Sequence, residues 1–355
     1  LETLGLCLAR EAGVALTFNE RRSAYAERAS RLARQVFARS AVADHHAWLA
    51  VGDALRHYFV GELDPAMAGF REAESIWNAQ PRSYLMNASQ MAIFTMGCLR
   101  YVGDLDALRR ELDRARRDAE WRGNRYLWTK STIAFQLRVL VQDGLDASRR
   151  DFARVDLDSP LARAGANAWY VARTIAEEAL YRGAAPDELE ASVRALSRFL
   201  RTQYGFVLTW GSELRWLIGR LWLALAEAGD PRGAARAHRV AKQLLRRRLA
   251  YAQIWGQALL AGVHAQRGDP ASARAALEEC AVRGELAGLV LVAKAARVRL
   301  GERGLGSGEA HREALAFFDA QRVADLEATL RVFLPGLTEA RALPAPPRAL
   351  PATAR

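Results

Sequence analysis

Small and apolar residues recur every three or four positions along most of the chain, and short turns containing glycine or aspartate separate these runs. A period of three to four residues is that of a helix with one buried face. No window shows the strict alternation of apolar and polar residues that predicts a half-buried strand. The pattern therefore predicts an all-α protein.

The tripeptide Gly-Asp-Pro occurs twice, at Gly229 and at Gly268, and in both places one helical run ends and another begins. Glycine reaches the left-handed conformation that closes a helix, aspartate accepts hydrogen bonds from the free N–H groups of the next helix, and proline suits a first helical turn. We therefore expect positive φ angles at both glycines. We also expect Asp230 and Asp269 to cap the helices that follow.

Small or apolar residues follow both glycines at offsets of +5, +9 and +12, which share one helical face. Four other turn glycines are followed by the same template. After Gly183 the offsets fit only if one residue is inserted, and in the unit of Gly144 they are counted from Asp143. The predicted hairpin turns are Gly61, Gly103, Gly144, Gly183, Gly229 and Gly268. His238 is expected to be partly buried. The predicted packing positions are Ala66, Phe70, Ala73, Leu108, Leu112, Ala115, Ser148, Phe152, Val155, Leu189, Val193, Leu196, Ala234, His238, Ala241, Ala273, Leu277 and Cys280.

Tryptophan is a second sign of the same repeat. Trp48, Trp216 and Trp255 each lie 13 residues before their turn glycine, and Trp169 lies 14 residues before Gly183. Each unit is therefore expected to be a first helix, a tight turn and a second helix. A single hairpin cannot bury its apolar face alone, so we expect the tryptophans to pack where neighbouring units meet.

The order of Gly61, Ala66, Phe70 and Ala73 resembles the tetratricopeptide repeat, which has a turn glycine, an alanine, an aromatic residue and another alanine at these offsets. The units here are longer, at about 40 residues rather than 34, and the first-helix Leu-Gly-Tyr signature is blurred. The resemblance covers about residues 19–318. It implies an α-solenoid of about seven tetratricopeptide-like hairpins, with a concave surface lined by the first helices.

The same spacing suggests how the chain is organised. Asn19 lies 42 residues before Gly61 and would be the left-handed turn residue of an incomplete first unit. Asp325 would cap a last short helix. The predicted segments are N-terminal helices (1–40), tetratricopeptide-like repeats (41–303), C-terminal capping helices (304–338) and a Pro- and Ala-rich tail expected to be disordered (339–355).

Residues 313–337 resemble the C-terminal ending of large bacterial serine/threonine kinases, which join a kinase domain, an AAA-type ATPase region and a long tetratricopeptide-like region. Asp325-Leu326 stands where that family usually has a proline. The resemblance implies that this chain is the regulatory C-terminal part of such a kinase, with phosphotransfer in a domain outside it. The residues that match the ending are Phe317, Phe318, Gln321, Pro335 and Gly336.

The formal net charge of the 355 residues is +11, which suggests an anionic partner or a nucleic acid. Lysine occurs only at positions 130, 242 and 294, so nearly all of the basic charge is arginine. Successive residues of a helix face different directions, so a basic run can also be a solvated helix end. The candidate binding residues for an anion or an acidic partner are Lys242, Arg246, Arg247 and Arg248.

Motifs of catalysis are missing from the sequence. Residues 301–310 are glycine-rich but lack the Gly-Lys-Ser/Thr ending of a phosphate-binding loop, and there are no kinase motifs and no Gly-x-Ser-x-Gly elbow. Asp44-His45-His46 could hold a metal but has no spaced partner ligands. We expect no cofactor and no metal, and whether the chain has an enzyme activity stays uncertain.

Three scattered cysteines without a paired spacing favour a reducing compartment, and we find no signal peptide. The most apolar stretch starts at residue 206, but Glu213, Arg215 and Arg220 interrupt it, which favours a buried helix over a membrane span. A cytoplasmic location is therefore expected. The cysteines are expected to be small core residues, at Cys7, Cys98 and Cys280.

These observations favour a non-catalytic protein-interaction or regulatory scaffold, as the C-terminal region of a bacterial signalling serine/threonine kinase. Its partner would be a protein or peptide, including other domains of the same polypeptide. One alternative is the inducer-sensing helical-repeat region of a STAND-type ATPase transcription regulator. A second is a nucleic-acid-binding helical repeat, although nucleic acid is not the partner we expect.

Overall fold

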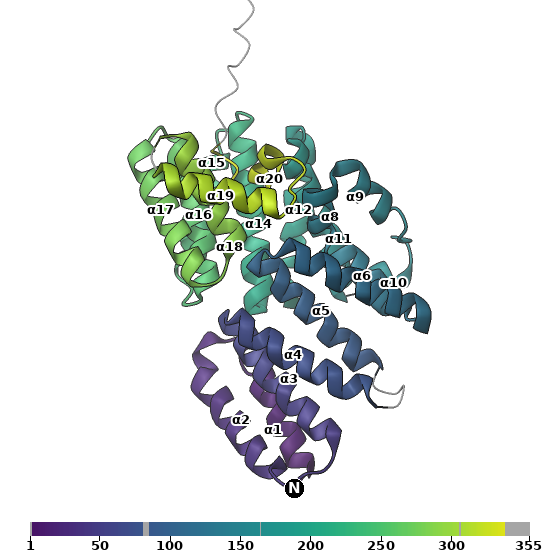
Figure 1. Ribbon diagram of the computed structural model, residues 1–355. Helices are drawn as coiled ribbons and strands as arrows, with labels where there is room; N and C mark the ends of the chain where they lie inside the picture. Colours follow the sequence, from purple (N-terminus) through teal and green to yellow (C-terminus); the bar gives the residue numbers. More distant parts are fainter. Residues whose placement is uncertain (1, 81–84, 164, 305–306, 338–355) are drawn as a thin grey trace, which may run out of the picture.

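The computed structural model describes residues 2–80, 85–163, 165–304 and 307–337, and every regular element within these ranges is a helix (Figure 1). The all-α prediction is confirmed, while the predicted tail (339–355) lies outside the described residues. The elements in chain order are α1 (Glu2–Val14), the 3₁₀ turn η1 (Glu20–Arg22), α2 (Ser23–Phe37), α3 (Ala43–Val60), α4 (Leu63–Asn78), α5 (Leu85–Val102), α6 (Leu105–Arg122), α7 (Arg125–Ala134), α8 (Gln136–Asp143), α9 (Leu145–Phe152), α10 (Pro160–Arg163), α11 (Gly165–Arg182), α12 (Pro186–Phe199), α13 (Gln203–Phe206), α14 (Leu208–Glu227), α15 (Gly233–Leu245), α16 (Ala250–Gln266), α17 (Pro270–Leu286), α18 (Val290–Glu302), α19 (Gly308–Ala320) and α20 (Leu326–Phe333).

Consecutive helices pack against each other along most of the chain, as α3 and α4, α14 and α15, and α16 and α17 do in Figure 1. The middle is less regular. Phe135 separates α7 from α8 with φ −127° and ψ 22°, and α10 and α13 are only 4 residues long. Pairwise packing of neighbouring helices is therefore the main rule of the fold, and it is interrupted between α7 and α13.

The C-terminal helices return to the middle of the chain. The side-chain oxygen of Gln321 accepts a hydrogen bond from the backbone N–H of Leu105 at 2.8 Å. Arg322 forms an ion pair with Asp106 at 2.5 Å. Helix α20 packs against α11 and α18, and α18 also contacts α5. The fold is thus closed by contacts between distant segments, where an open solenoid would leave its concave side free.

The six predicted turn glycines all have positive φ angles, as the hairpin prediction requires. At Gly61 the backbone N–H donates to the carbonyls of His57 and Tyr58, which closes α3. Gly144 differs, because its ψ angle is 176° and α9 begins at the next residue. The φ angles are 93° at Gly61, 89° at Gly103, 84° at Gly144, 63° at Gly183, 95° at Gly229 and 71° at Gly268.

The two Gly-Asp-Pro segments fold differently after their glycines. Asp269 accepts a hydrogen bond from the backbone N–H of Ser272 at 3.0 Å, so the predicted cap of α17 is confirmed. Asp230 instead accepts from the N–H of Arg232 at 2.8 Å, and α15 begins only at Gly233 with no side-chain cap. The cap predicted at Asp230 is wrong.

The late start of α15 has a packing cause. A Cβ atom at Gly233 would lie 2.6 Å from the carbonyl oxygen of Trp222, so only glycine allows α15 to approach α14 this closely. The first part of the buried face of α15 is consequently shifted by one position. Gly233 and Ala237 are buried, whereas Ala234, a packing position of the template, is half-buried. His238 is half-buried, as expected. The other template positions are buried apart from Phe152, which is half-buried.

Two predictions for single residues near the N-terminus are wrong. Asn19 is extended, with φ −148° and ψ 104°, because its side chain accepts a hydrogen bond from the N–H of Arg21 and caps η1. Cys7 is exposed, whereas Cys98 and Cys280 are buried as expected. Helix α1 has no helix packed on the outer side of Cys7 among the described residues, so this face meets solvent.

The tryptophans of the first helices divide into two kinds. Trp216 of α14 and Trp255 of α16 stack with ring centroids 4.8 Å apart, and this pair confirms the prediction of packing between neighbouring units. Trp169 lies against Phe199 of α12, its own hairpin partner. Trp48 likewise lies against Trp77 of α4. Two of the four tryptophans therefore pack within their unit.

The first helices of the hairpins meet at the centre of the fold. Tyr101 of α5 lies beside Trp255 of α16, with ring centroids 5.9 Å apart, and Tyr58 of α3 lies beside Tyr101. Side chains therefore occupy the region where the sequence predicts an open concave surface. Among the described residues, no helix is long and apolar enough to cross a membrane.

Candidate functional site

A groove of about 690 Å³ lies between α12 and α15, with α14 at its base. In Figure 1 the labels of α12 and α15 stand on either side of that of α14. The groove is rich in arginine and poor in acidic residues. Its lining residues are Glu190, Val193, Arg194, Ser197, Arg198 and Arg201 from α12 and the turn after it, Trp222 from α14, and Arg232, Arg236, Arg239 and Val240 from α15 and the turn before it.

Helical spacing places these arginines side by side. On α12 and its end, Arg194, Arg198 and Arg201 are separated by four and three residues. On α15 and its start, residues 232, 236 and 239 repeat the same separations. Residues three and four apart share one helical face, so each helix presents a row of guanidinium groups to the groove.

Most of this positive charge has no partner. Glu190, the one acidic lining residue, pairs with Arg232 at 2.9 Å and with Arg194 at 3.4 Å. Asp230 also pairs with Arg232 at 3.0 Å, and this hydrogen-bonded contact lowers the pKa of the Asp230 carboxyl. In the described part of the chain, the other four arginines form no ion pair. They are Arg198, Arg201, Arg236 and Arg239.

The base of the groove is apolar. Val193 and Trp222 are buried there, and Val240 is half-buried. The guanidinium carbon of Arg236 lies 4.3 Å from the centroid of the Trp222 ring, so this arginine already covers the aromatic face. The groove thus combines an apolar floor with guanidinium groups along both sides. Such groups bind carboxylates and phosphates through paired N–H donors.

The predicted cluster lies beside this groove and does not line it. Lys242 is exposed in the last turn of α15, three residues after the groove residue Arg239. Helix α15 ends at Leu245, so Arg246 and residues 247–248 belong to the following turn. The cluster therefore stays a predicted basic helix end that adjoins the groove.

Sequence reasoning missed the groove, although its signal is present. Arginines spaced by four and three residues occur both in residues 194–201 and in residues 232–239. Each row alone looks like an ordinary solvated helix face. The two rows become one site only because α12 and α15 both pack on α14.

A second polar cluster is buried at the centre of the fold. Arg100 of α5 donates to Glu213 of α14 at 2.6 Å and to Glu177 of α11 at 2.7 Å. Arg173 donates to Glu213 at 3.2 Å. Arg220, which is fully buried, lies 3.9 Å from Glu177 and donates to the carbonyl of residue 332 at the end of α20 at 2.7 Å. Charged groups of three helices and a backbone carbonyl of a fourth meet here.

The ionisation of this buried cluster is set by its own pairs. Burial alone would raise the pKa of Glu213, but the guanidinium groups of Arg100 and Arg173 and the hydroxyl of Tyr101 outweigh it and lower the pKa to about 2. Burial lowers the pKa of Arg220 to about 10. The cluster therefore stays charged near neutral pH, and all of its residues are closed off from solvent.

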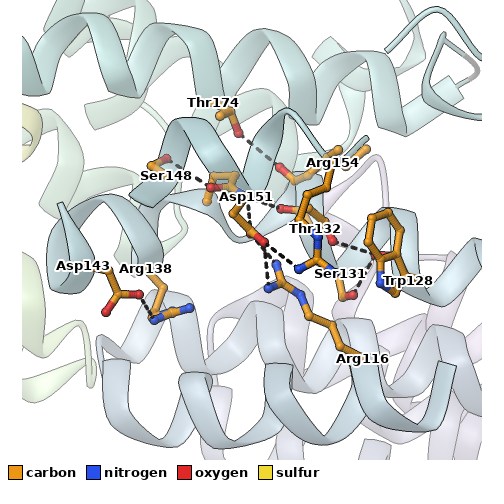
Figure 2. A network of polar contacts seen from close by, with 12 residues as sticks. Arg116, Trp128, Ser131, Thr132, Arg138, Asp143, Ser148, Asp151, Arg154 and Thr174 are labelled. Atoms are coloured by element: carbon orange, nitrogen blue, oxygen red, sulfur yellow. Dashed lines mark hydrogen bonds and ion pairs between the residues drawn. The ribbon is translucent and has the colours of Figure 1, made fainter. Parts of the chain in front are cut away.

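A third network joins α6, α7, α8 and α9, and Figure 2 shows it. Asp151 accepts hydrogen bonds from Arg116 at 2.7 and 3.2 Å and from Gln136 at 2.7 Å. Gln136 also donates to the carbonyl of Thr132 at 3.1 Å, which bridges the break between α7 and α8. Since Asp151 is paired with Arg116, the network holds the helix break in place.

The histidine pair that could suggest a metal has structural partners. His45 is buried, stacks on Phe37 at 4.2 Å and bonds the hydroxyl of Ser40 at 2.7 Å. Asp44 accepts a hydrogen bond from the indole N–H of Trp77 at 2.8 Å. No group of three or more His, Cys, Asp or Glu side chains within the described ranges is placed to hold a metal ion.

No family model matches the chain, and neither curated proteins nor solved structures give a significant match. The tetratricopeptide and kinase resemblances therefore stay predictions. The function has to be argued from the geometry of the sites, because an all-helical fold by itself does not specify one.

Proposed function

We propose that this chain is a non-catalytic interaction module that binds an acidic protein segment in the groove between α12 and α15. The observation that carries the proposal is that four arginines around an apolar floor, Arg198, Arg201, Arg236 and Arg239, have no carboxylate partner among the described residues. A segment that carries carboxylates beside an apolar side chain would satisfy both parts of the groove.

The dimensions of the groove suit a peptide. Residues 190–201 of its α12 side span about 17 Å, because a helix rises about 1.5 Å per residue. An extended peptide covers this length with about five residues. Val240, which is half-buried, offers a place for one apolar side chain between flanking acidic ones.

The same surface is less suited to binding nucleic acid. Single-stranded nucleic acid gains much of its binding energy by stacking bases on exposed aromatic rings. The one aromatic ring in the groove is that of Trp222, which is buried and covered by Arg236. An acidic protein segment therefore fits better than an oligonucleotide.

The alternative of an inducer-sensing region requires space for a small molecule, and there is little between the first helices. The two cavities at the meeting point of the first helices have volumes of about 10 and 30 Å³. Pockets for small organic ligands usually have about 300 Å³ or more. An inducer could enter these two cavities only if the central helices rearranged, so a small ligand would need a pocket elsewhere, such as the one of about 960 Å³ lined by Leu180, Leu189 and Arg331.

The proposal fits the regulatory part of a signalling protein, where an acidic segment of the same polypeptide or of another protein would dock. The resemblance of residues 313–337 to the ending of bacterial kinases motivates this role. The groove accounts for binding in such a protein and implies no chemistry.

Fluorescence anisotropy with a short labelled peptide rich in glutamate and leucine tests the proposal. The groove variant is Arg198→Gln/Arg239→Gln. The matched control is Arg122→Gln/Arg274→Gln, which removes the same charge from arginines that pair within their own helices, with Asp118 and Glu278. We expect the groove variant to bind at least about tenfold more weakly, because each charge-assisted contact contributes about 1 kcal/mol or more.

Two outcomes would contradict the proposal. Equal losses in the groove variant and in the control would show that net charge, and no particular surface, attracts the peptide. Tighter binding of a single-stranded oligonucleotide, lost in the groove variant, would assign the groove to nucleic acid instead.

A further inference from the structure

A small cavity of about 30 Å³ lies beside the buried charge cluster, away from the arginine groove. This space has room for about one or two particles of the size of a water molecule. Its wall is formed by aromatic rings and by charged groups of the cluster. The residues of the wall with polar groups are Tyr58, Gln90, Arg100, Tyr101, Tyr170, Arg173, Trp210 and Glu213.

The charges around this cavity do not balance. In the part of the chain that the structure describes, the cluster has three guanidinium groups, those of Arg100, Arg173 and Arg220, and two carboxylates, those of Glu177 and Glu213. One positive charge therefore remains, in a region where all five side chains are at most 6% exposed. A buried charge without a counter-charge is strongly destabilising.

A lysine adds to the excess. Lys130 is buried, and its ammonium group lies 6.0 Å from the centroid of the Tyr170 ring, which lines the cavity. Its hydrogen-bond partner is the hydroxyl of Tyr126 at 2.7 Å, and no carboxylate pairs with it among the described residues. The surroundings of the cavity are thus more positive than the cluster alone.

The wall of the cavity also has unused hydrogen-bond donors. The Nε atoms of Arg100 and Arg173 are buried and have no hydrogen-bond partner within the described ranges, although that of Arg173 lies 4.0 Å from the carboxylate of Glu177. The hydroxyl of Tyr170 is likewise without a partner there. The acceptors are already engaged, since Glu213 accepts from Arg100, Arg173 and Tyr101. A wall with spare donors and excess positive charge favours an anion over a neutral molecule.

We propose that this central cavity binds a single monovalent anion of about the size of chloride. The ion would accept hydrogen bonds from the guanidinium groups of Arg100 and Arg173 and from the hydroxyl of Tyr170. It would neutralise the charge that Glu177 and Glu213 leave uncompensated.

Thermal unfolding of the wild-type chain at constant ionic strength provides the first test. Chloride is exchanged stepwise for gluconate, which is too large for the cavity. We expect a saturable rise in Tm of about 1–3 °C with chloride, because a ligand that binds only the folded chain stabilises it. A Tm that is identical in both salts would overturn the proposal and leave water as the occupant.

A conservative substitution tests whether the chloride response comes from the cavity. Tyr170→Phe removes one proposed donor without removing a charge, and we expect the chloride concentration at half-maximal effect to rise about three- to tenfold. Tyr181→Phe is the matched control, because Tyr181 is a buried tyrosine of the same helix α11 that does not line the cavity. A chloride response that both variants leave unchanged would refute the assignment.

Bromide diffraction locates the ion directly. Crystals grown in sodium bromide are expected to show an anomalous peak in hydrogen-bond contact with Arg173 and Tyr170. A peak only at the protein surface, or no peak at all, would show that the chloride response comes from elsewhere and would overturn the proposal.

Discussion

The arginines at the centre of the fold and those of the α12–α15 groove differ in what surrounds them. Arg100 and Arg173 are buried and bonded to Glu177 and Glu213, so their charges connect helices that lie far apart in the sequence. The groove arginines are exposed, and four of them have no carboxylate partner among the described residues. The same residue type therefore stabilises the fold in one region and remains free to bind a partner in the other.

The largest effect that separates the two regions is expected from removing one carboxylate. Glu213→Gln leaves Arg100 and Arg173 without their shared counter-charge, and we expect a loss of about 3–5 kcal/mol in the free energy of unfolding. Glu190→Gln, which removes the only carboxylate of the groove lining, should change it by less than about 1 kcal/mol. Urea unfolding of both variants measures the difference between their free energies of unfolding. Equal losses would contradict the distinction between the two regions.

Acid should remove the stabilisation that Glu213 gives to the centre of the fold. The pKa of Glu213 is lowered to about 2 from an ordinary value near 4.5, so its ionised form stabilises the folded chain. This contribution, on the order of 3 kcal/mol, is fully present above pH 4.5 and is lost as the pH falls towards 2. Urea unfolding between pH 5 and 2 should show a shallower decline in Glu213→Gln than in the wild type. Parallel declines would contradict this.

Lys130 provides the opposite case, a buried charge without a carboxylate partner. Burial lowers the pKa of its ammonium group to about 8 from 10.5, so the protonated form destabilises the fold near neutral pH. Lys130→Met should stabilise the chain by about 2 kcal/mol at pH 7, after the loss of the bond to Tyr126. This advantage should shrink as the pH rises from 8 to 10.5, because the wild-type lysine then loses its proton. A destabilised variant at pH 7 would contradict the account.

The smallest effect is expected in the groove itself. Arg194, Arg198 and Arg201 repel one another along one helical face, so Arg198→Gln should leave stability unchanged or raise it by a few tenths of a kcal/mol. The gain should be larger at low ionic strength, because salt screens exposed charges. Chemical unfolding at two salt concentrations measures it. A loss above about 1 kcal/mol would mean that Arg198 supports the fold.

The features that could be predicted from the sequence depend on residues that lie close together in the chain. The helices and the positive φ angles at the turn glycines follow from residues a few positions apart, and Asp269 caps its helix as expected. Asp230 was mispredicted because the start of α15 is decided by the close packing of Gly233 against α14, which no local pattern reveals.

The candidate sites depend on contacts between distant segments. The central cluster joins Arg100 to residues 77 and 113 positions further along the chain, so its ion pairs could not be read from spacing. The groove joins two arginine rows across α14 in the same way. The predicted cluster at Lys242 lies at the end of α15 and in the turn after it, outside the lining of the groove, and it stays a prediction.

The central claim is that the groove arginines are free to bind an acidic segment, whereas the central arginines are buried. Footprinting with phenylglyoxal, which modifies accessible guanidinium groups, tests it most directly. The modified residues are identified by mass spectrometry with and without the acidic peptide. The account predicts that the groove arginines react in the free chain and are protected by the peptide, while Arg100, Arg173 and Arg220 stay unmodified in both states. Groove arginines that react equally with and without bound peptide, or protection confined to another surface, would contradict it. The groove arginines to follow are Arg198, Arg201, Arg236 and Arg239.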